Sequence, residues 1–200
     1  GKVLGDFAVG KLGMKSMVII DDRTAYGKGL ADVVERTVKG AGKAPSAREF
    51  TDDKATDFQA ILTSAKGKKP DVIFYGGMDP QAGPMAKQIK SLGINAKFVA
   101  GDGVQTPNFI QLAGAAAEGH YASSPGVPLD KMSSGSAFAD KLVAKYKTKI
   151  ELYAPYGYDA AMLFVEAMKK ADSADPAKYL PALAGISHTG VTGPTATVPG

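Results

Sequence analysis

The chain has 200 residues, a net charge of +4 and a hydrophobic content of 44%, which suits one large domain or one domain with part of another. With no cysteine and only two histidines, it excludes disulfides, thiolate or histidine-rich metal sites and a cysteine nucleophile. Its basic residues are dispersed and no apolar run approaches ~18 residues, so neither nucleic-acid binding nor membrane insertion is expected.

The first 123 residues alternate between helical and strand patterns. Amphipathic spacing predicts helices over 2–12, 27–41, 81–92 and 107–114, and one that opens near Asp57 with Thr56 or Asp57 as its N-cap. Short apolar runs predict strands over 17–20, 47–50, 72–75, 97–100 and 120–122. Strands without polar alternation, each followed by an amphipathic helix, predict an α/β fold with a doubly wound, five-stranded parallel sheet of the flavodoxin-like type.

The pattern changes after residue 123. A Ser-, Pro- and Gly-rich loop over 123–128 leads to predicted helices over 136–147 and 157–171, and Pro176 opens a further helical turn that ends near Gly185. The tail over 189–200 has no helical pattern and room for one short strand. These additional C-terminal helices carry apolar residues but have no strands of their own to cover.

Five separated motifs stand in one order along the chain, over 18–29, 71–77, 101–104, 117–119 and 156–160. Together they closely resemble the leucine/isoleucine/valine-binding proteins, the type I periplasmic solute-binding family of ABC importers. The resemblance implies two lobes that close on a branched-chain or related amino acid, an ABC permease as partner and a periplasmic location. It implies neither a cofactor nor a catalytic residue, so no enzyme activity is expected.

The resemblance also suggests how the chain is divided. Residues 1–123 resemble the second ligand-binding lobe, and residues 124–200 resemble the segment that returns to complete the first lobe, whose own sheet is absent. It therefore implies a partial or engineered form with at most a half-site. The exposed apolar helices are then expected to dock on a separate first-lobe chain, on a second copy, or back on this lobe.

Asp102 and Tyr26 are the principal candidate ligand residues. Ligands of parallel sheets bind beyond the carboxyl ends of the strands, where the turns 21–26, 76–79 and 101–103 are predicted. The spacing alone favours a simple turn role for Asp102, which stands between two glycines. The resemblance instead implies that Asp102 binds the α-ammonium group of the ligand and that Tyr26 covers the ligand, whereas packing on the lobe surface is the plainer role for Tyr26.

Four further residues belong to the same predicted site. Gly77 and Met78 follow the third strand, where relatives often have an aromatic residue, and Met78 would shape a pocket for an apolar side chain. Tyr153 and Tyr156 precede the predicted helix over 157–171, in a stretch where the family has a pocket aromatic. Tyr153 fits that spacing better, although core packing explains either tyrosine equally well.

Other short patterns in the sequence are typical of different functions. Paired acids at Asp21-Asp22 are typical of Mg²⁺-binding receiver domains, but the third strand has no acid at its end. Gly27-Lys28-Gly29 lies too far beyond the first strand for a dinucleotide fingerprint. A ligand-sensing regulatory domain of the same fold and a flavodoxin-like enzyme with a bound cofactor remain as alternatives to the binding protein.

Overall fold

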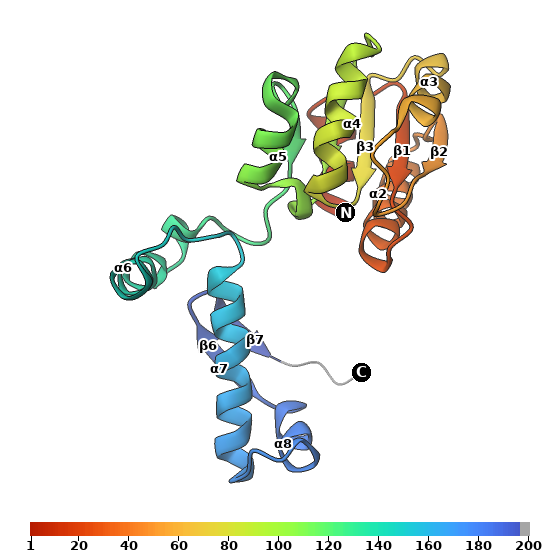
Figure 1. The fold of residues 1–200 in the computed structure, drawn as a ribbon. Coiled ribbons are helices and arrows are strands. Elements are labelled where there is room, and N and C mark those ends of the chain that lie inside the picture. The colour runs from red at the N-terminus through yellow and green to blue at the C-terminus, as the bar shows by residue number, and fades with distance from the viewer. Residues whose placement is uncertain (197–200) are drawn as a thin grey trace. The chain divides into compact units, whose positions relative to one another are not determined.

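The chain divides into two compact units, Gly1–Pro125 (unit 1) and Gly126–Gly200 (unit 2), in a computed structural model that describes residues 1–196 (Figure 1). The last four residues of the predicted tail, 197–200, lie outside the described residues. No helix within residues 1–196 is both long enough and apolar enough to cross a membrane.

Unit 1 is built on a five-stranded parallel sheet with the strand order β2-β1-β3-β4-β5. Its strands are β1 (Met17–Asp21), β2 (Ala47–Phe50), β3 (Val72–Gly76), β4 (Lys97–Ala100) and β5 (Tyr121–Ala122). Its α-helices are α1 (Lys2–Gly10), α2 (Ala25–Gly40), α3 (Gln59–Gly67), α4 (Asp79–Ser91) and α5 (Pro107–Ala113). The predicted α/β fold and the doubly wound parallel sheet are confirmed.

Both faces of the sheet are covered, as the unbroken apolar strands require (Figure 1). Helices α1 and α2 pack on one face, where Ile19 and Phe74 are fully buried. Helices α3, α4 and α5 pack on the other face, against side chains that include Ile20, Tyr75 and Phe98. Successive residues of β1 and β3 therefore point alternately into two apolar layers.

The predicted N-cap of α3 is wrong. The helix begins at Gln59 with Phe58 as its N-cap, and no side chain caps it. Asp57 Oδ1 accepts a hydrogen bond from the Gln59 amide at 3.0 Å, which satisfies one of the unpaired N–H groups of the first turn from outside the helix.

The strand register brings three loops to one edge of the sheet. Asp21 of β1 pairs with Gly76 of β3, and Tyr75 pairs with Ala100 of β4. The strands therefore end nearly level with one another. The loops that follow β1, β3 and β4 are the three turns in which the sequence places candidate site residues.

Unit 2 contains α6 (Gly135–Tyr146), α7 (Ala154–Ala171), α8 (Pro176–Leu183) and an antiparallel pair of strands, β6 (Ser187–Gly190) and β7 (Gly193–Ala196). The prediction of at most one short strand in the tail is wrong, because the Gly190–Gly193 turn allows the chain to fold back as a hairpin. The positive φ of 103° at Gly193 is one that side chains rarely adopt, which explains the glycine there.

A buried carboxylate joins this hairpin to helix α7. Asp159 is 3% exposed and accepts hydrogen bonds from Val191 N at 2.9 Å, Thr192 N at 2.7 Å and Thr192 Oγ1 at 2.6 Å. Burial raises the pKa of the Asp159 carboxyl group, but the hydrogen bonds from Thr192 and Val191 and the nearby His188 outweigh burial and leave this pKa below its usual value.

We expect Asp159→Ala to lower the protection of the Val191 and Thr192 amides against hydrogen exchange by about 1.5–3 kcal/mol, because these bonds go to a charged acceptor. The folded pKa lies below the unfolded value of about 3.9, so the stabilisation is complete above that pH and is lost as the pH falls through the folded pKa. Native-state hydrogen exchange by NMR measures the first effect. Asp140→Ala, an exposed carboxylate on α6, is the control and should leave both amides protected.

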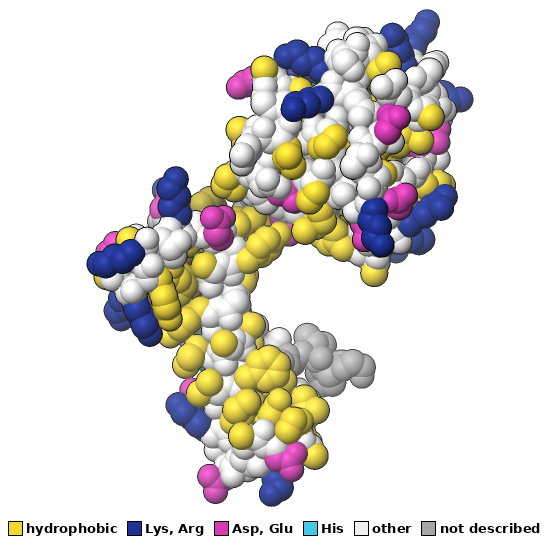
Figure 2. Space-filling model, viewed as in Figure 1, with side chains coloured by type: hydrophobic (Ala, Val, Ile, Leu, Met, Phe, Trp, Pro, Cys, Tyr) yellow, Lys and Arg dark blue, Asp and Glu magenta, His cyan; other side chains and the backbone are white. Residues whose placement is uncertain are grey.

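Unit 2 exposes many large hydrophobic side chains. The most exposed on its helices are Tyr146 (62%) and Leu180 (52%), and several more lie on α7. Figure 2 shows hydrophobic side chains gathered over α7 and α8. Within the described residues, this unit has no sheet of its own large enough to bury these faces.

Candidate functional site

Tyr26 and Asp102 meet at the carboxyl edge of the unit 1 sheet. The Tyr26 hydroxyl group donates a hydrogen bond to Asp102 Oδ1 at 3.0 Å and accepts one from the Gly103 amide at 3.1 Å. Tyr26 lies in the first turn of α2, and Asp102 begins a short 3₁₀ turn (Asp102–Val104) directly after β4. Two residues that are 76 positions apart in the chain thus form one cluster.

The glycines on either side of Asp102 make room for this cluster. A Cβ atom at position 101 would lie 2.6 Å from Tyr26 Oη and would also overlap Leu30, and one at position 103 would lie 2.5 Å from Met78 Sδ. The space beside the Asp102 backbone is therefore filled by side chains of the protein itself. The sequence analysis did not predict that Leu30 belongs to this cluster. The spacing could have indicated it, because Leu30 follows Tyr26 by four residues and so lies on the same face of α2.

The electrostatics of the cluster keep the tyrosine hydroxyl group protonated. Burial raises the pKa of Tyr26 to about 12, and the hydrogen bond to Asp102 adds to this effect against the opposing bond from Gly103. A carboxylate at this edge is suited to an ammonium group.

The first turn of α2, which carries Tyr26, is held in place by β1 and β3. Asp22 Oδ1 accepts hydrogen bonds from Thr24 Oγ1 at 2.7 Å and Thr24 N at 3.0 Å, and Thr24 Oγ1 in turn caps the Gly27 amide at 2.9 Å. Gly27 lies so close to Gly76 that a Cβ atom on either residue would overlap the carbonyl oxygen of the other. This packing explains why glycine is present at both positions.

Of the other predicted residues, Gly77 and Met78 join the cluster within unit 1. The Gly77 carbonyl oxygen and the Met78 sulfur both lie against Gly103, and Met78 is 46% exposed at the rim. Tyr153 and Tyr156 belong to unit 2. Helix α7 begins at Ala154, earlier than predicted, because Pro155 is well suited to a first helical turn; Tyr156 therefore lies inside the helix instead of preceding it.

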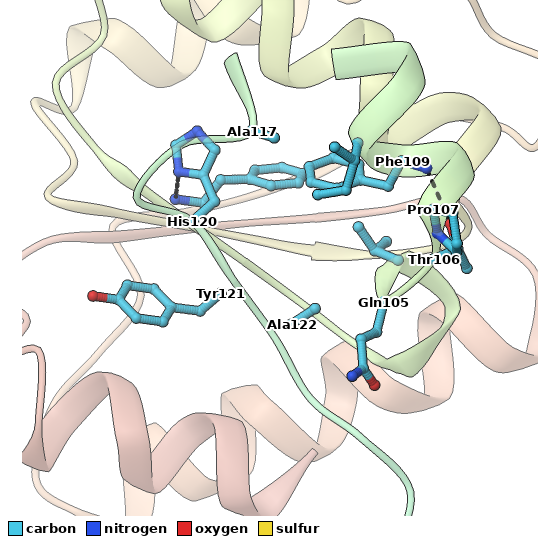
Figure 3. A pocket seen from close by; sticks show the side chains of 11 residues that line it. Gln105, Thr106, Pro107, Phe109, Ala117, His120, Tyr121 and Ala122 are labelled. Atoms are coloured by element: carbon cyan, nitrogen blue, oxygen red, sulfur yellow. Dashed lines mark hydrogen bonds between the residues drawn. The ribbon is translucent and has the colours of Figure 1, made fainter. Parts of the chain in front are cut away.

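A separate hollow of about 430 Å³ lies beside the edge strand β5, between it and α5 (Figure 3). Its lining is mostly apolar, with Phe98, Phe109 and Ile110 among it, and the described residues that line it include no acidic side chain. His120 Nδ1 accepts a hydrogen bond from Phe98 N at 3.1 Å, and burial, together with Lys97, lowers the pKa of His120, so the imidazole is neutral there. The described residues that line this hollow therefore offer no anion to an ammonium group.

Comparison with known proteins gives a match along nearly the whole chain. The family model described as periplasmic binding protein matches residues 1–199. The chain belongs to the periplasmic binding protein family. A Pseudomonas aeruginosa relative in this family, named leucine-, isoleucine-, valine-, threonine-, and alanine-binding protein, is 28% identical over 193 residues, which are 96% of this chain and 52% of the relative. The Leu/Ile/Val-binding protein BraC3 of Rhizobium johnstonii is 32% identical over 164 residues, 82% of this chain and 44% of the relative.

Solved structures of this family agree with the fold. The leucine-binding protein LivK of Thermotoga maritima has a TM-score of 0.85 at 26% identity over 96% of this chain and 55% of LivK. LivJ of Streptococcus pneumoniae, solved in complex with isoleucine, has a TM-score of 0.79 at 28% identity over 98% of this chain and 56% of LivJ. The chain spans about half the length of the curated relatives it matches.

Proposed function

We propose that this chain forms part of a solute-binding protein of an ABC importer, in which unit 1 is one of two lobes that close on a branched-chain or related amino acid. The observation that carries the proposal is the carboxylate of Asp102, held at the carboxyl edge of the sheet by a neutral tyrosine hydroxyl group. A buried ammonium group needs such an anionic acceptor. The names of the relatives as leucine-, isoleucine- and valine-binding proteins support this ligand class.

In this proposal, residues 1–123 are the second lobe and residues 124–200 return to the first lobe, with Tyr153 or Tyr156 adding an aromatic side chain to the pocket. The ligand ammonium group binds Asp102, while Met78 and the rim of the Tyr26 ring contact its apolar side chain. The protein acts in the periplasm with an ABC permease, binds without a cofactor and catalyses no reaction. The relatives named above do not support a regulatory role.

The exposed apolar faces of unit 2 belong to the same proposal. They bury themselves against a first lobe supplied by another chain, against a second copy of this one, or back on this lobe. Of these, docking on a second copy predicts that the 200-residue chain associates with itself in solution. Light scattering that shows a monodisperse monomer with solvent-exposed helices would contradict this part of the proposal.

Asp102→Asn tests the ligand site directly. On its own the chain offers one lobe's groups, so we expect leucine binding to be weak or absent, with a Kd of about 1 mM or more. NMR titration of the ¹⁵N-labelled chain should shift the amides of Tyr26, Met78 and Gly103. Asp102→Asn should weaken binding about 10- to 100-fold, as expected for a hydrogen bond to a charged group.

The matched control for this titration is Asp130→Asn, an exposed acid in unit 2. It should leave leucine binding unchanged. Equal affinity of the wild-type chain and the Asp102→Asn variant would show that the ammonium group binds elsewhere, and the assignment of the site would be wrong.

A further inference from the structure

We propose that Tyr26 is a positioning residue, whose hydroxyl group fixes the Asp102 carboxylate and the Gly103 amide in the geometry that receives an ammonium group. This inference rests on the proposed function and deepens it. It replaces the expectation that Tyr26 acts mainly as an aromatic cover over the ligand.

The hydrogen-bonding capacity of the hydroxyl group is already used within the protein. A tyrosine hydroxyl has a single proton to donate, and that proton is directed to Asp102 Oδ1 at 3.0 Å. The same oxygen accepts the Gly103 amide at 3.1 Å. Donation to a ligand carboxylate would therefore require Tyr26 to release Asp102.

The hydroxyl group contacts two parts of the Asp102 turn, the side chain of Asp102 and the amide that follows it. The carboxylate torsion of aspartate is broad, so the hydrogen bond from Tyr26 contributes to where Asp102 Oδ1 points. Tyr26 Oη lies over both flanking glycines and bonds to the side chain and to the next amide at once. With a pKa raised to about 12 by burial, the hydroxyl group remains a donor throughout the neutral range.

Tyr26 is itself fixed by the sheet. Asp22, which directly follows β1, orients Thr24, and Thr24 caps the first turn of α2 in which Tyr26 lies. Asp22 is 3% exposed, which protects these hydrogen bonds from water. A chain of contacts thus leads from β1 through Thr24 and Tyr26 to Asp102.

Tyr26→Phe removes the hydroxyl group and keeps the ring, so it separates the two roles. We expect it to weaken binding of leucine to the 200-residue chain about tenfold by NMR titration. Isopentylamine, which keeps the ammonium group and carbon chain of leucine but lacks its carboxylate, should lose affinity by the same factor. In an Asp102→Asn background, Tyr26→Phe should change affinity by less than about twofold, because the two residues act as one unit.

A readout without ligand accompanies the titration. Tyr26→Phe should increase hydrogen exchange at the Gly103 amide and move its resonance, whereas Tyr121→Phe, a tyrosine of the same unit outside the Asp102 turn, should do neither. Unchanged binding by Tyr26→Phe, or a loss for leucine that spares isopentylamine, would overturn the proposal. If the Asp102→Asn variant binds as tightly as the wild-type chain, the proposed ammonium site is wrong; if the wild-type chain binds neither amine, one lobe alone does not hold the ligand. In both cases hydrogen exchange at the Gly103 amide decides whether Tyr26 positions the turn.

Discussion

Replacing Gly27 with alanine should destabilise unit 1 by about 3 kcal/mol, at the upper end of what overpacking usually costs. The added methyl group would overlap Asp22 Oδ1 and the Gly76 carbonyl oxygen, and neither can move freely. Asp22 is buried and bonded to Thr24, and the Gly76 carbonyl oxygen accepts the Asp22 amide at 3.0 Å. The first turn of α2 would have to lift off the end of β3.

Gly29→Ala is the matched control, because it lies in the same helix two residues further on. A Cβ atom at position 29 meets nothing within 4 Å, so alanine there should stabilise the helix by about 0.5–1 kcal/mol. Urea denaturation followed by circular dichroism, with hydrogen exchange of the β1 and β3 amides to locate the change, measures both variants. Two changes of the same sign would disprove the packing argument.

Removing the Arg48 guanidinium group should lower the free energy of unfolding at least as much as the Gly27→Ala substitution. Asp21 is fully buried, and Arg48 bonds to it through Nη2 and through Nε at 2.8 Å. Arg48 also reaches Asp32 and Glu35, each at 3.0 Å. Arg48→Met would leave the Asp21 carboxylate buried without its cation, and we expect a loss of about 3–5 kcal/mol in the free energy of unfolding.

Two further variants show whether buried charge is the cause. Asp21→Asn in the Arg48→Met background should recover much of the stability, because it removes the uncompensated charge. Lys28→Met breaks the exposed ion pair with Asp32 and should cost less than about 0.5 kcal/mol. Equal losses in the Lys28 and Arg48 variants by urea denaturation would show that burial of Asp21 is not the reason.

The contacts of Asp21 and Asp22 also explain why these two acids stand next to each other. In the sequence they resemble a metal-binding pair. In the structure, the side chains point to different partners. Asp21 forms an ion pair with Arg48 on the neighbouring strand, whereas Asp22 orients Thr24 at the start of α2. Successive residues at the end of a strand face opposite sides of the sheet, which accounts for the division of roles.

The sequence by itself determined the class of fold and the edge at which to look for a site. Unbroken apolar strands that alternate with amphipathic helices require a parallel sheet covered on both faces, and the ends of such strands are where ligands bind. Asp102, Tyr26, Gly77 and Met78 lie in the loops at this edge, but their ligand roles were predicted from the resemblance to the leucine/isoleucine/valine-binding proteins and not from these patterns. In the structure, these four residues lie together within unit 1.

Only the tertiary structure shows which residues far apart in the chain pack against or hydrogen-bond to one another. The sequence places glycines on both sides of Asp102, but only the structure shows that the space they leave is taken by Tyr26, Leu30 and Met78. Likewise, the turn of the β6–β7 hairpin is bonded to the buried carboxylate of Asp159. This carboxylate accepts a hydrogen bond from the Val191 amide, which lies 32 residues further along the chain. Local patterns report which face of an element is buried, whereas these contacts depend on the register and packing of separate elements, which local patterns do not specify.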